Sequence, residues 1–273
     1  MIDVVLLGTG TPMPDPARCG SGVAVVRDGR WILIDCGRGV TQRVMEAGLD
    51  LAGLEAVALT HHHSDHVSDL ATLAIARWVD GEPLPLRVVA PSGPCATFAR
   101  GCLDGFVDQA FYSQANSDSP IRPTVTVVEF TPADRPCSVF ESSPWVVSSA
   151  LVDHSPIEAA VGYRIEVDGR TLVISGDTAR CVGIERLAAG ADLLIHEAVR
   201  SDRASPALLA WNASARSVGE LARDLGLPRV VLTHLLPAPQ TDDDERAFFE
   251  EARHGGYAGE VVVARDRMWL TIP

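Results

Sequence analysis

The sequence contains no lysine. All 23 basic residues are arginine, which excludes Schiff-base chemistry, pyridoxal phosphate anchoring and a P-loop lysine. The six cysteines form no Cys-x-x-Cys pair, so a thiolate zinc finger and a redox dithiol are disfavoured. No apolar run approaches the ~18 residues of a membrane-spanning helix, and no basic segment precedes the first apolar run. We therefore expect a cytoplasmic protein with no membrane partner.

Positive charge is also scarce. The 36 acidic residues exceed the 23 basic ones and give a formal net charge of −13. Such a charge disfavours binding to a phosphate backbone unless the arginines cluster, so nucleic acid is a poor candidate partner. The 273 residues, 47% of them hydrophobic, are typical of a globular protein. This length suits one large α/β domain or two small ones.

Two similar halves are visible along the chain. Each half contains a predicted β-hairpin with an Asp-Gly turn, at Asp28-Gly29 and at Asp168-Gly169. The segments 53–61 and 226–234 agree at six of nine positions, and each is an apolar run that ends in Thr-His. We expect two related halves that close on each other.

Helical patterns lie between and after these strands, at 67–79, 214–225 and 242–253. Hairpins with helices outside them predict an α/β fold, specifically a four-layer α/β/β/α sandwich. We expect a single domain over 1–273, with an irregular rim segment at about 80–144 that includes a helix around 95–110 and a strand at 124–130.

The densest chemical feature is His61-His62-His63-Ser64-Asp65-His66, which holds four of the eight histidines. Alternate side chains of an extended stretch share a side, so His61 and His63 can approach one metal ion. Asp65 and His66, at the opening of the next helix, can turn toward a second ion. Imidazole and carboxylate ligands suit Zn²⁺, with Mn²⁺ or Fe as alternatives where oxygen ligands share the site.

At these residues the sequence resembles the metallo-β-lactamase superfamily, and within it the ribonuclease Z-like branch. The resemblance spans nearly the whole chain and uses short motifs. These are Gly8-Thr9-Gly10-Thr11-Pro12, Ile34-Asp35-Cys36-Gly37, His61 to His66, Val152-Asp153-His154, Ser175-Gly176-Asp177-Thr178, His196-Glu197-Ala198 and Leu232-Thr233-His234.

The resemblance implies a site with two divalent metal ions. One ion would be bound by His61, His63 and His154, the other by Asp65, His66 and His234, and both by Asp177 as a bridge. It also implies the same α/β/β/α fold, and a homodimer. A metal ion lowers the pKa of bound water from far above neutrality to about 7, so the expected nucleophile is a metal-bound hydroxide. Asp65 would accept or orient the proton of that water.

Two departures from the family pattern bear on the substrate. Family members that trim transfer RNA usually carry a long arm between the third histidine motif and the bridging aspartate, but a single predicted hairpin fills the interval from His154 to Asp177. Those members also place a histidine 22 residues before the last ligand, and here that position is Asn212. Asparagine cannot transfer a proton to a leaving group at neutral pH. Glu197 is then either an acid whose pKa is raised by burial or a buried structural carboxylate.

The leading hypothesis is a metal-dependent hydrolase that cleaves a small phosphodiester or a related activated ester. The same metal ions would serve an aryl sulfate, lactone or carboxylic ester hydrolase. The sequence does not separate these alternatives, because the rim segment that would set substrate selectivity carries no motif. Transfer RNA 3′ processing and a non-catalytic metal-binding scaffold are further alternatives.

Overall fold

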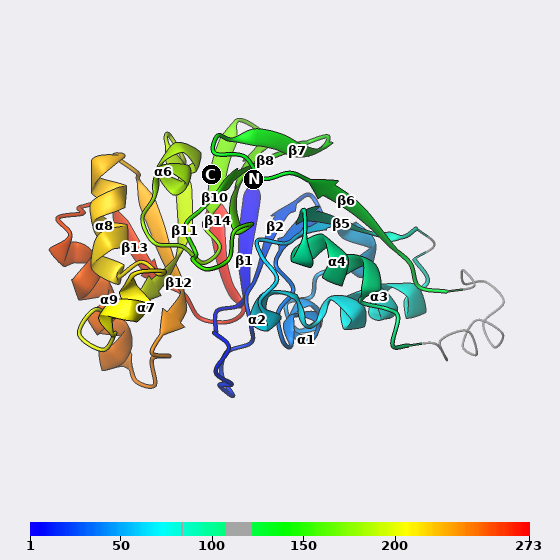
Figure 1. Ribbon diagram of the computed structural model, residues 1–273, viewed down its shortest axis with the longest axis horizontal. Helices are drawn as coiled ribbons and strands as arrows, with labels where there is room; N and C mark the ends of the chain where they lie inside the picture. The colour runs from blue at the N-terminus through cyan, green and yellow to red at the C-terminus, as the bar shows by residue number, and fades with distance from the viewer. Residues whose placement is uncertain (83, 107–121) are drawn as a thin grey trace. The chain divides into compact units, whose positions relative to one another are not determined.

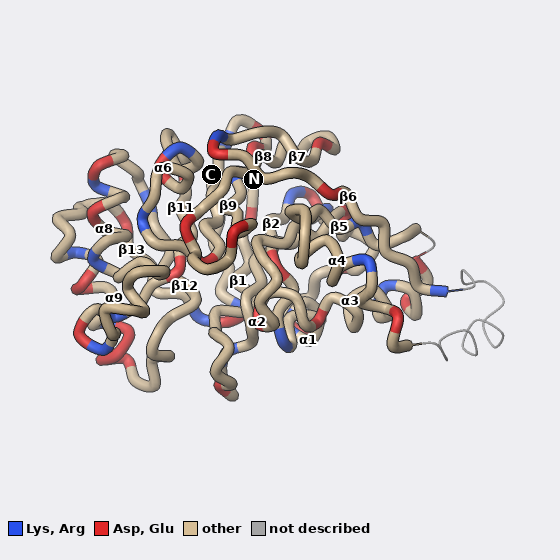
Figure 2. The backbone as a smooth tube through the Cα atoms, in the orientation of Figure 1, with Lys and Arg blue, Asp and Glu red and all other residues tan. Residues whose placement is uncertain are grey.

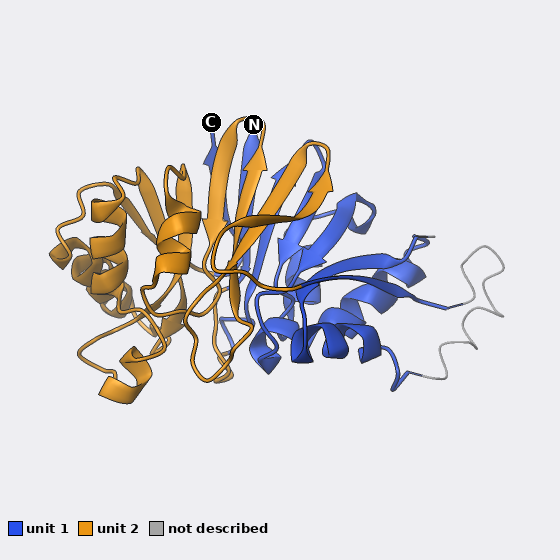
Figure 3. Cartoon of the chain, turned by 45° about the horizontal axis from the view of Figure 1, so that its top comes forward, with its two compact units in different colours: residues 1–8, 16–130, 266–273 blue, residues 9–15, 131–265 orange. Residues whose placement is uncertain are grey.

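The computed structural model describes residues 1–82, 84–106 and 122–273. Its contacts divide the chain into two compact units (Figure 3). Unit 1 consists of Met1–Gly8, Pro16–Phe130 and Asp266–Pro273, and unit 2 consists of Thr9–Asp15 and Thr131–Arg265. Each unit contains one seven-stranded mixed sheet with helices packed on it (Figure 1). The expected single domain over 1–273 stays a prediction.

The sheet of unit 1 has the strand order β14-β1-β2-β3-β4-β5-β6. Its strands are β1 (Ile2–Gly8), β2 (Gly22–Arg27), β3 (Arg30–Ile34), β4 (Leu54–Ala58), β5 (Leu86–Pro91), β6 (Val125–Phe130) and β14 (Met268–Ile272). The pairings from β14 to β3 are antiparallel, and those from β3 to β6 are parallel.

The sheet of unit 2 has the order β13-β12-β11-β10-β9-β8-β7. Its strands are β7 (Cys137–Ser142), β8 (Trp145–Leu151), β9 (Val161–Val167), β10 (Arg170–Ile174), β11 (Leu193–Val199), β12 (Arg229–Leu236) and β13 (Glu260–Val263). Here too an antiparallel half, β7 to β10, is followed by a parallel half, β10 to β13. The two units therefore repeat one topology, as the internal similarity of the sequence predicts.

Both predicted hairpins are confirmed. β2 pairs with β3 and β9 pairs with β10, and the Asp and Gly of each turn have positive φ, for example 51° at Asp28 and 77° at Gly29. Aspartate and glycine tolerate this left-handed conformation, which matches the twist of the flanking strands. Each hairpin fixes the strand that leads into a Gly/Asp motif, Asp35-Cys36-Gly37 or Gly176-Asp177.

Helices cover each sheet and enclose an apolar core. In unit 1 they are α1 (Val40–Glu46), α2 (Ser64–Val67), α3 (Leu70–Val79) and α4 (Pro94–Gly101), with the 3₁₀ turn η1 (Leu51–Gly53). In unit 2 they are α6 (Val182–Ala188), α7 (Pro206–Leu209), α8 (Ala215–Asp224) and α9 (Asp242–His254). Every residue of β11 is buried, as expected for a strand with a parallel neighbour on each side.

Two helix predictions need correction. The helix expected at 67–79 is divided, because the chain turns at Ser68-Asp69 and Asp69 Oδ2 accepts a hydrogen bond from Thr41 N at the start of α1 (2.7 Å). The helix expected at 95–110 ends at Gly101, and a hydrogen-bonded turn follows. Residues 107–121 of the rim segment lie outside the described residues, while its predicted strand is present as β6.

None of the helices in the described ranges is long and apolar enough to span a membrane. The arginines are scattered among acidic residues along the described chain rather than gathered in one stretch (Figure 2). All six cysteines are free; Cys36 and Cys95 are buried, and Cys137 is exposed.

Candidate metal centre

Most of the predicted ligands follow, or lie near the ends of, strands in the parallel half of each sheet, whereas His154 follows β8 in the antiparallel half of unit 2. In unit 1, β3 leads into Asp35, and β4 leads through Thr60 to the histidine motif. In unit 2, β10 leads to Asp177, while Glu197 and His234 lie near the ends of β11 and β12. Because parallel strands end at the same edge of a sheet, this topology gathers polar side chains that are distant in sequence.

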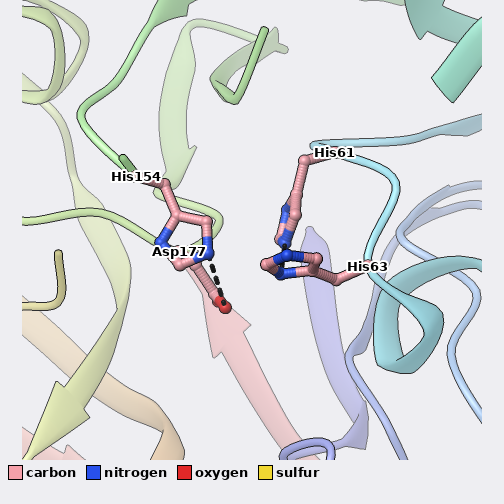
Figure 4. A group of neighbouring side chains, drawn as sticks. All are labelled: His61, His63, His154 and Asp177. Carbon is pink, nitrogen blue, oxygen red and sulfur yellow. Dashed lines mark hydrogen bonds and ion pairs between the residues drawn. The ribbon is translucent and has the colours of Figure 1, made fainter. Parts of the chain in front are cut away.

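His61 and His63 lie together, as the alternation of the strand predicts. His61 Nε2 is 3.0 Å from His63 Nδ1 (Figure 4). Thr60 Oγ1 is within hydrogen-bond distance of both Asp35 Oδ2 (2.9 Å) and His61 Nδ1 (3.0 Å). The hydroxyl therefore donates to the carboxylate and accepts from the imidazole, which leaves Nε2 of His61 as the ligand atom.

Asp35 organises the rest of this loop. Its carboxylate accepts hydrogen bonds from Thr60 N (2.8 Å) and from His66 Nδ1 (2.7 Å), and both side chains of the Asp35–His66 pair are 1% exposed. The contact fixes the tautomer and orientation of His66, so that its Nε2 lies 3.6 Å from Asp65 Oδ2. Sequence patterns predict no role for Asp35, although it directly follows an apolar strand and lies two residues before Gly37.

The backbone of Asp65 is locked by close packing. Its carbonyl accepts from Ser21 N (2.8 Å), and a Cβ on Gly37 would lie 1.8 Å from that carbonyl oxygen. Only glycine permits this approach, which explains the Gly of the Asp-Cys-Gly motif. Burial, Asp69 and Asp35 raise the pKa of the Cys36 thiol well above its ordinary value, so Cys36 is not a thiolate ligand.

In unit 2, His154, Asp177 and His234 converge. Asp177 Oδ2 lies 3.9 Å from His154 Nε2 (dashed line in Figure 4) and 3.4 Å from His234 Nε2. His154 Nδ1 donates to the backbone carbonyl of Trp211 (3.2 Å), which leaves Nε2 as the ligand atom. One carboxylate oxygen therefore approaches two imidazoles, the position that a bridging ligand requires.

A β-bulge aims His234. The pairing of β11 with β12 shifts register between Glu197 and Ala198, and His234 has φ of 47°. The next residue, Leu235, donates its N–H to the carbonyl of Thr9 (3.4 Å). An extra residue in one strand changes the direction of a side chain at the strand end, and no sequence pattern predicts this bulge.

Glu197 lies beside these ligands. Glu197, Asp177 and His234 offer ligand atoms within 4.8 Å of one another, and Glu197 Oε1 accepts from Thr178 N (2.5 Å). This contact ties the glutamate to the turn that presents Asp177. The neighbouring His196 donates from Nδ1 to the carbonyl of Glu197, and burial lowers the pKa of His196 to about 4, so its imidazole is neutral.

Asn212 is held in the segment after α7. Its side chain is 5% exposed, and Nδ2 donates to Leu208 O (3.0 Å). The side-chain amide is thus hydrogen-bonded to the backbone. His62, by contrast, is only half-buried, and His254 is exposed.

The donor sets of both units fit divalent metal ions. Six of the seven predicted ligands are buried, with exposed fractions of 0% for His61, 2% for Asp65, 1% for His66, 6% for His154, 4% for Asp177 and 4% for His234. Buried carboxylates are costly unless they are paired or coordinate a cation. Imidazole nitrogens and carboxylate oxygens at these separations are the donors that Zn²⁺, Mn²⁺ and Fe prefer.

An Asp35→Asn substitution should weaken metal binding by about 10- to 100-fold, because an amide N–H facing His66 favours the tautomer that protonates Nε2. Competition with a chromophoric chelator measures this affinity. Ser21→Ala is the matched control, since it removes only a 3.3 Å contact to the same carboxylate. Equal affinities for Asp35→Asn and the parent would contradict the orienting role of Asp35.

The chain is similar to known proteins of one superfamily. The Beta-lactamase superfamily domain matches residues 30–235. Ribonuclease Z of Mycolicibacterium paratuberculosis is 36% identical over 277 aligned residues, which cover 97% of this chain and 96% of that protein.

Solved structures show the same fold. The metallo-beta-lactamase fold protein YhfI from Bacillus subtilis has a TM-score of 0.77 and 22% identity, with 98% of each chain covered. The short form of human tRNase Z has a TM-score of 0.73 and 24% identity, with 99% of each chain covered. The metallo-β-lactamase fold expected from the sequence is confirmed.

The chain belongs to the β-lactamase superfamily, in its ribonuclease Z branch, and is a hydrolase. Membership of this fold family implies divalent metal ions, in agreement with the donor sets of the two units.

Proposed function

We propose that the protein is a dinuclear metal phosphodiesterase that acts on a small diester with a good leaving group. The ligand assignment is that of the family motifs: His61, His63 and His154 for one ion, Asp65, His66 and His234 for the other, and Asp177 for both. The approach of Asp177 Oδ2 to two imidazoles is the single observation that best supports this proposal. When bound, two divalent ions activate water and polarise the ester.

The chain's own residues prepare the site for this chemistry. Asp35 and the carbonyl of Trp211 fix the tautomers of His66 and His154, so that their Nε2 atoms are free of protons. Asp65 Oδ2, near His66 Nε2, accepts the proton of the attacking water. Glu197 holds the Asp177 turn through Thr178, and its use as a leaving-group acid remains a prediction.

The substrate is proposed from charge and from Asn212. The net charge of −13, the absence of lysine and the scattered arginines favour a small substrate over a folded RNA. With Asn212 in place of the family's histidine, no imidazole stands there to protonate an alkoxide. Zn²⁺ is the proposed ion, and a homodimer is proposed from the family alone.

Cleavage of a transfer RNA precursor is the second candidate, because the curated relative bears the name of a ribonuclease. That relative aligns along 97% of this chain and 96% of its own length, so the alignment leaves no room in it for a long segment that this chain lacks. Between His154 and Asp177 this chain has only the β9/β10 hairpin. The short interval therefore does not separate the two candidates, and substrate assays must.

A substrate panel tests the proposal. The metal-loaded protein is incubated with bis-p-nitrophenyl phosphate, an aryl sulfate, a lactone, an aryl carboxylic ester and a precursor transfer RNA. We expect the phosphodiester to be cleaved fastest. Efficient 3′ trimming of the RNA, or faster cleavage of another ester, would show that the proposed substrate class is wrong.

Asn212→His should selectively accelerate diesters with poor leaving groups, by up to the ~10²-fold that a positioned acid contributes. Nitrophenyl esters should change little, because nitrophenolate departs unprotonated. The measurement is kcat/KM against leaving-group pKa for both proteins. Asn212→Gln, which cannot transfer a proton, is the control. An equal gain in kcat/KM for all leaving groups would contradict a role of residue 212 in leaving-group protonation.

A further inference from the structure

Trp211 is exposed beside a predicted metal ligand. Of the tryptophans, all of which are described, Trp211 (41% exposed) and Trp269 (47%) have exposed side chains. Trp269 lies on the edge strand β14, whereas the backbone carbonyl of Trp211 is hydrogen-bonded to His154 Nδ1 at 3.2 Å. An indole is large and apolar, and leaving it exposed forfeits the free energy of its burial.

The backbone of Trp211 is fixed on both sides. Trp211 N and Asn212 Nδ2 both donate to Leu208 O, at 3.2 and 3.0 Å. On the other side, Val199 N at the end of β11 donates to Ala213 O (2.9 Å). Short α7 begins at a Ser205 cap with Pro206 in its first turn. The backbone at Trp211 is therefore held in place by hydrogen bonds.

We propose that the indole of Trp211 is the stacking platform for a flat aromatic ring of the substrate, either an aryl group esterified to phosphate or the nucleobase of a nucleoside phosphate. The inference rests on the proposed phosphodiesterase function and names its substrate class. The carbonyl that orients the proposed ligand His154 belongs to Trp211, so the exposed indole is carried by a residue whose backbone contacts the metal site. Stacking on tryptophan recognises a π-face without base-specific hydrogen bonds.

The geometry also links recognition to chemistry. An aromatic ring stacked on Trp211 would hold its phosphate ester against the ligands that Trp211 helps to orient. When the stacked ring is an aryl group, the P–O bond to it breaks and the ring departs as a phenolate without help from an acid. This suits a site whose Asn212 side chain is occupied with Leu208 O.

The test measures binding rather than turnover. The metal-loaded protein is titrated by calorimetry with phenyl phosphate, adenosine 5′-monophosphate and inorganic phosphate. The variants are Trp211→Ala, Trp211→Phe and, as a control of matched exposure, Trp269→Ala. We expect Trp211→Ala to weaken the affinity for both aromatic ligands by about 5- to 100-fold. The affinity for inorganic phosphate should stay within about twofold of the parent value. Trp211→Phe should recover most of the loss, and Trp269→Ala should bind like the parent.

The ligands separate the outcomes. Tighter binding of the nucleotide than of phenyl phosphate assigns the ring to a nucleobase, and the reverse assigns it to a simple aryl group. Equal weakening of all three ligands by Trp211→Ala, or no change in any, overturns the platform while leaving the phosphodiesterase proposal intact. Binding of aromatic ligands through Trp211 without hydrolysis of any diester overturns the phosphodiesterase proposal alone. No binding of any ligand overturns both.

Discussion

An Asp177→Ala protein should lose bound metal and turnover together. Asp177 Oδ2 approaches both His154 Nε2 and His234 Nε2, so the substitution removes the ligand proposed for both ions and the negative charge between them. Metal content per chain after gel filtration, and kcat on a nitrophenyl diester, measure the two losses. We expect turnover near background and less than one ion per chain.

Unfolding must be separated from loss of the bridge. Asp177→Asn, which keeps the volume and one acceptor oxygen, should give the same loss of turnover with a native circular dichroism spectrum. Asp134→Asn, at an exposed carboxylate in the same unit, should keep both ions and full activity. Two ions and near-parental turnover in Asp177→Asn would show that the aspartate does not bridge.

The second large effect is expected for Asp65→Asn. The amide cannot take the proton of the attacking water, so kcat should fall by a factor on the order of 10²–10⁴. The fold should persist, because it is the backbone carbonyl of residue 65 that Ser21 N contacts and that leaves no room for a Cβ on Gly37.

Metal content distinguishes the two roles proposed for Asp65. Assays at saturating metal remove the contribution of a weakened ligand, and single-turnover measurements isolate the chemical step. A rate within a few-fold of the parent at equal metal loading would exclude Asp65 as proton acceptor. Asp69→Asn, at the nearby carboxylate that contacts Thr41 N, serves as the control for general electrostatic change.

Local sequence patterns predicted the hairpins and the pairing of His61 with His63. The first depends on Asp-Gly turns and the second on strand alternation, and both act over a few residues. The contact of Asp177 with His154 and His234 was implied only by family resemblance, because the residues lie far apart along the chain. Parallel pairing of β10, β11 and β12 brings Asp177 near His234, and the bridge between Asp153 and Ala179 brings His154 near Asp177.

The features that sequence patterns did not predict depend on tertiary contacts. The role of Asp35 needs Thr60 and His66 to fold back onto it, and the aim of His234 needs a bulge. The helix predicted at 95–110 is longer than the observed α4, which ends at Gly101, because apolar periodicity does not predict where a helix ends. The hydrogen bond from His154 to the carbonyl of Trp211 has no sequence signature, because every residue has a backbone carbonyl.

Metal removal and restoration, followed on one preparation, test the central claim most directly. The protein is stripped with a chelator, and Zn²⁺ is added back in known amounts while hydrolysis of bis-p-nitrophenyl phosphate is recorded. The dinuclear proposal predicts loss of turnover on stripping and recovery that is complete only when two ions per chain are bound. Full turnover in the stripped protein, or complete recovery at one ion per chain, would contradict it.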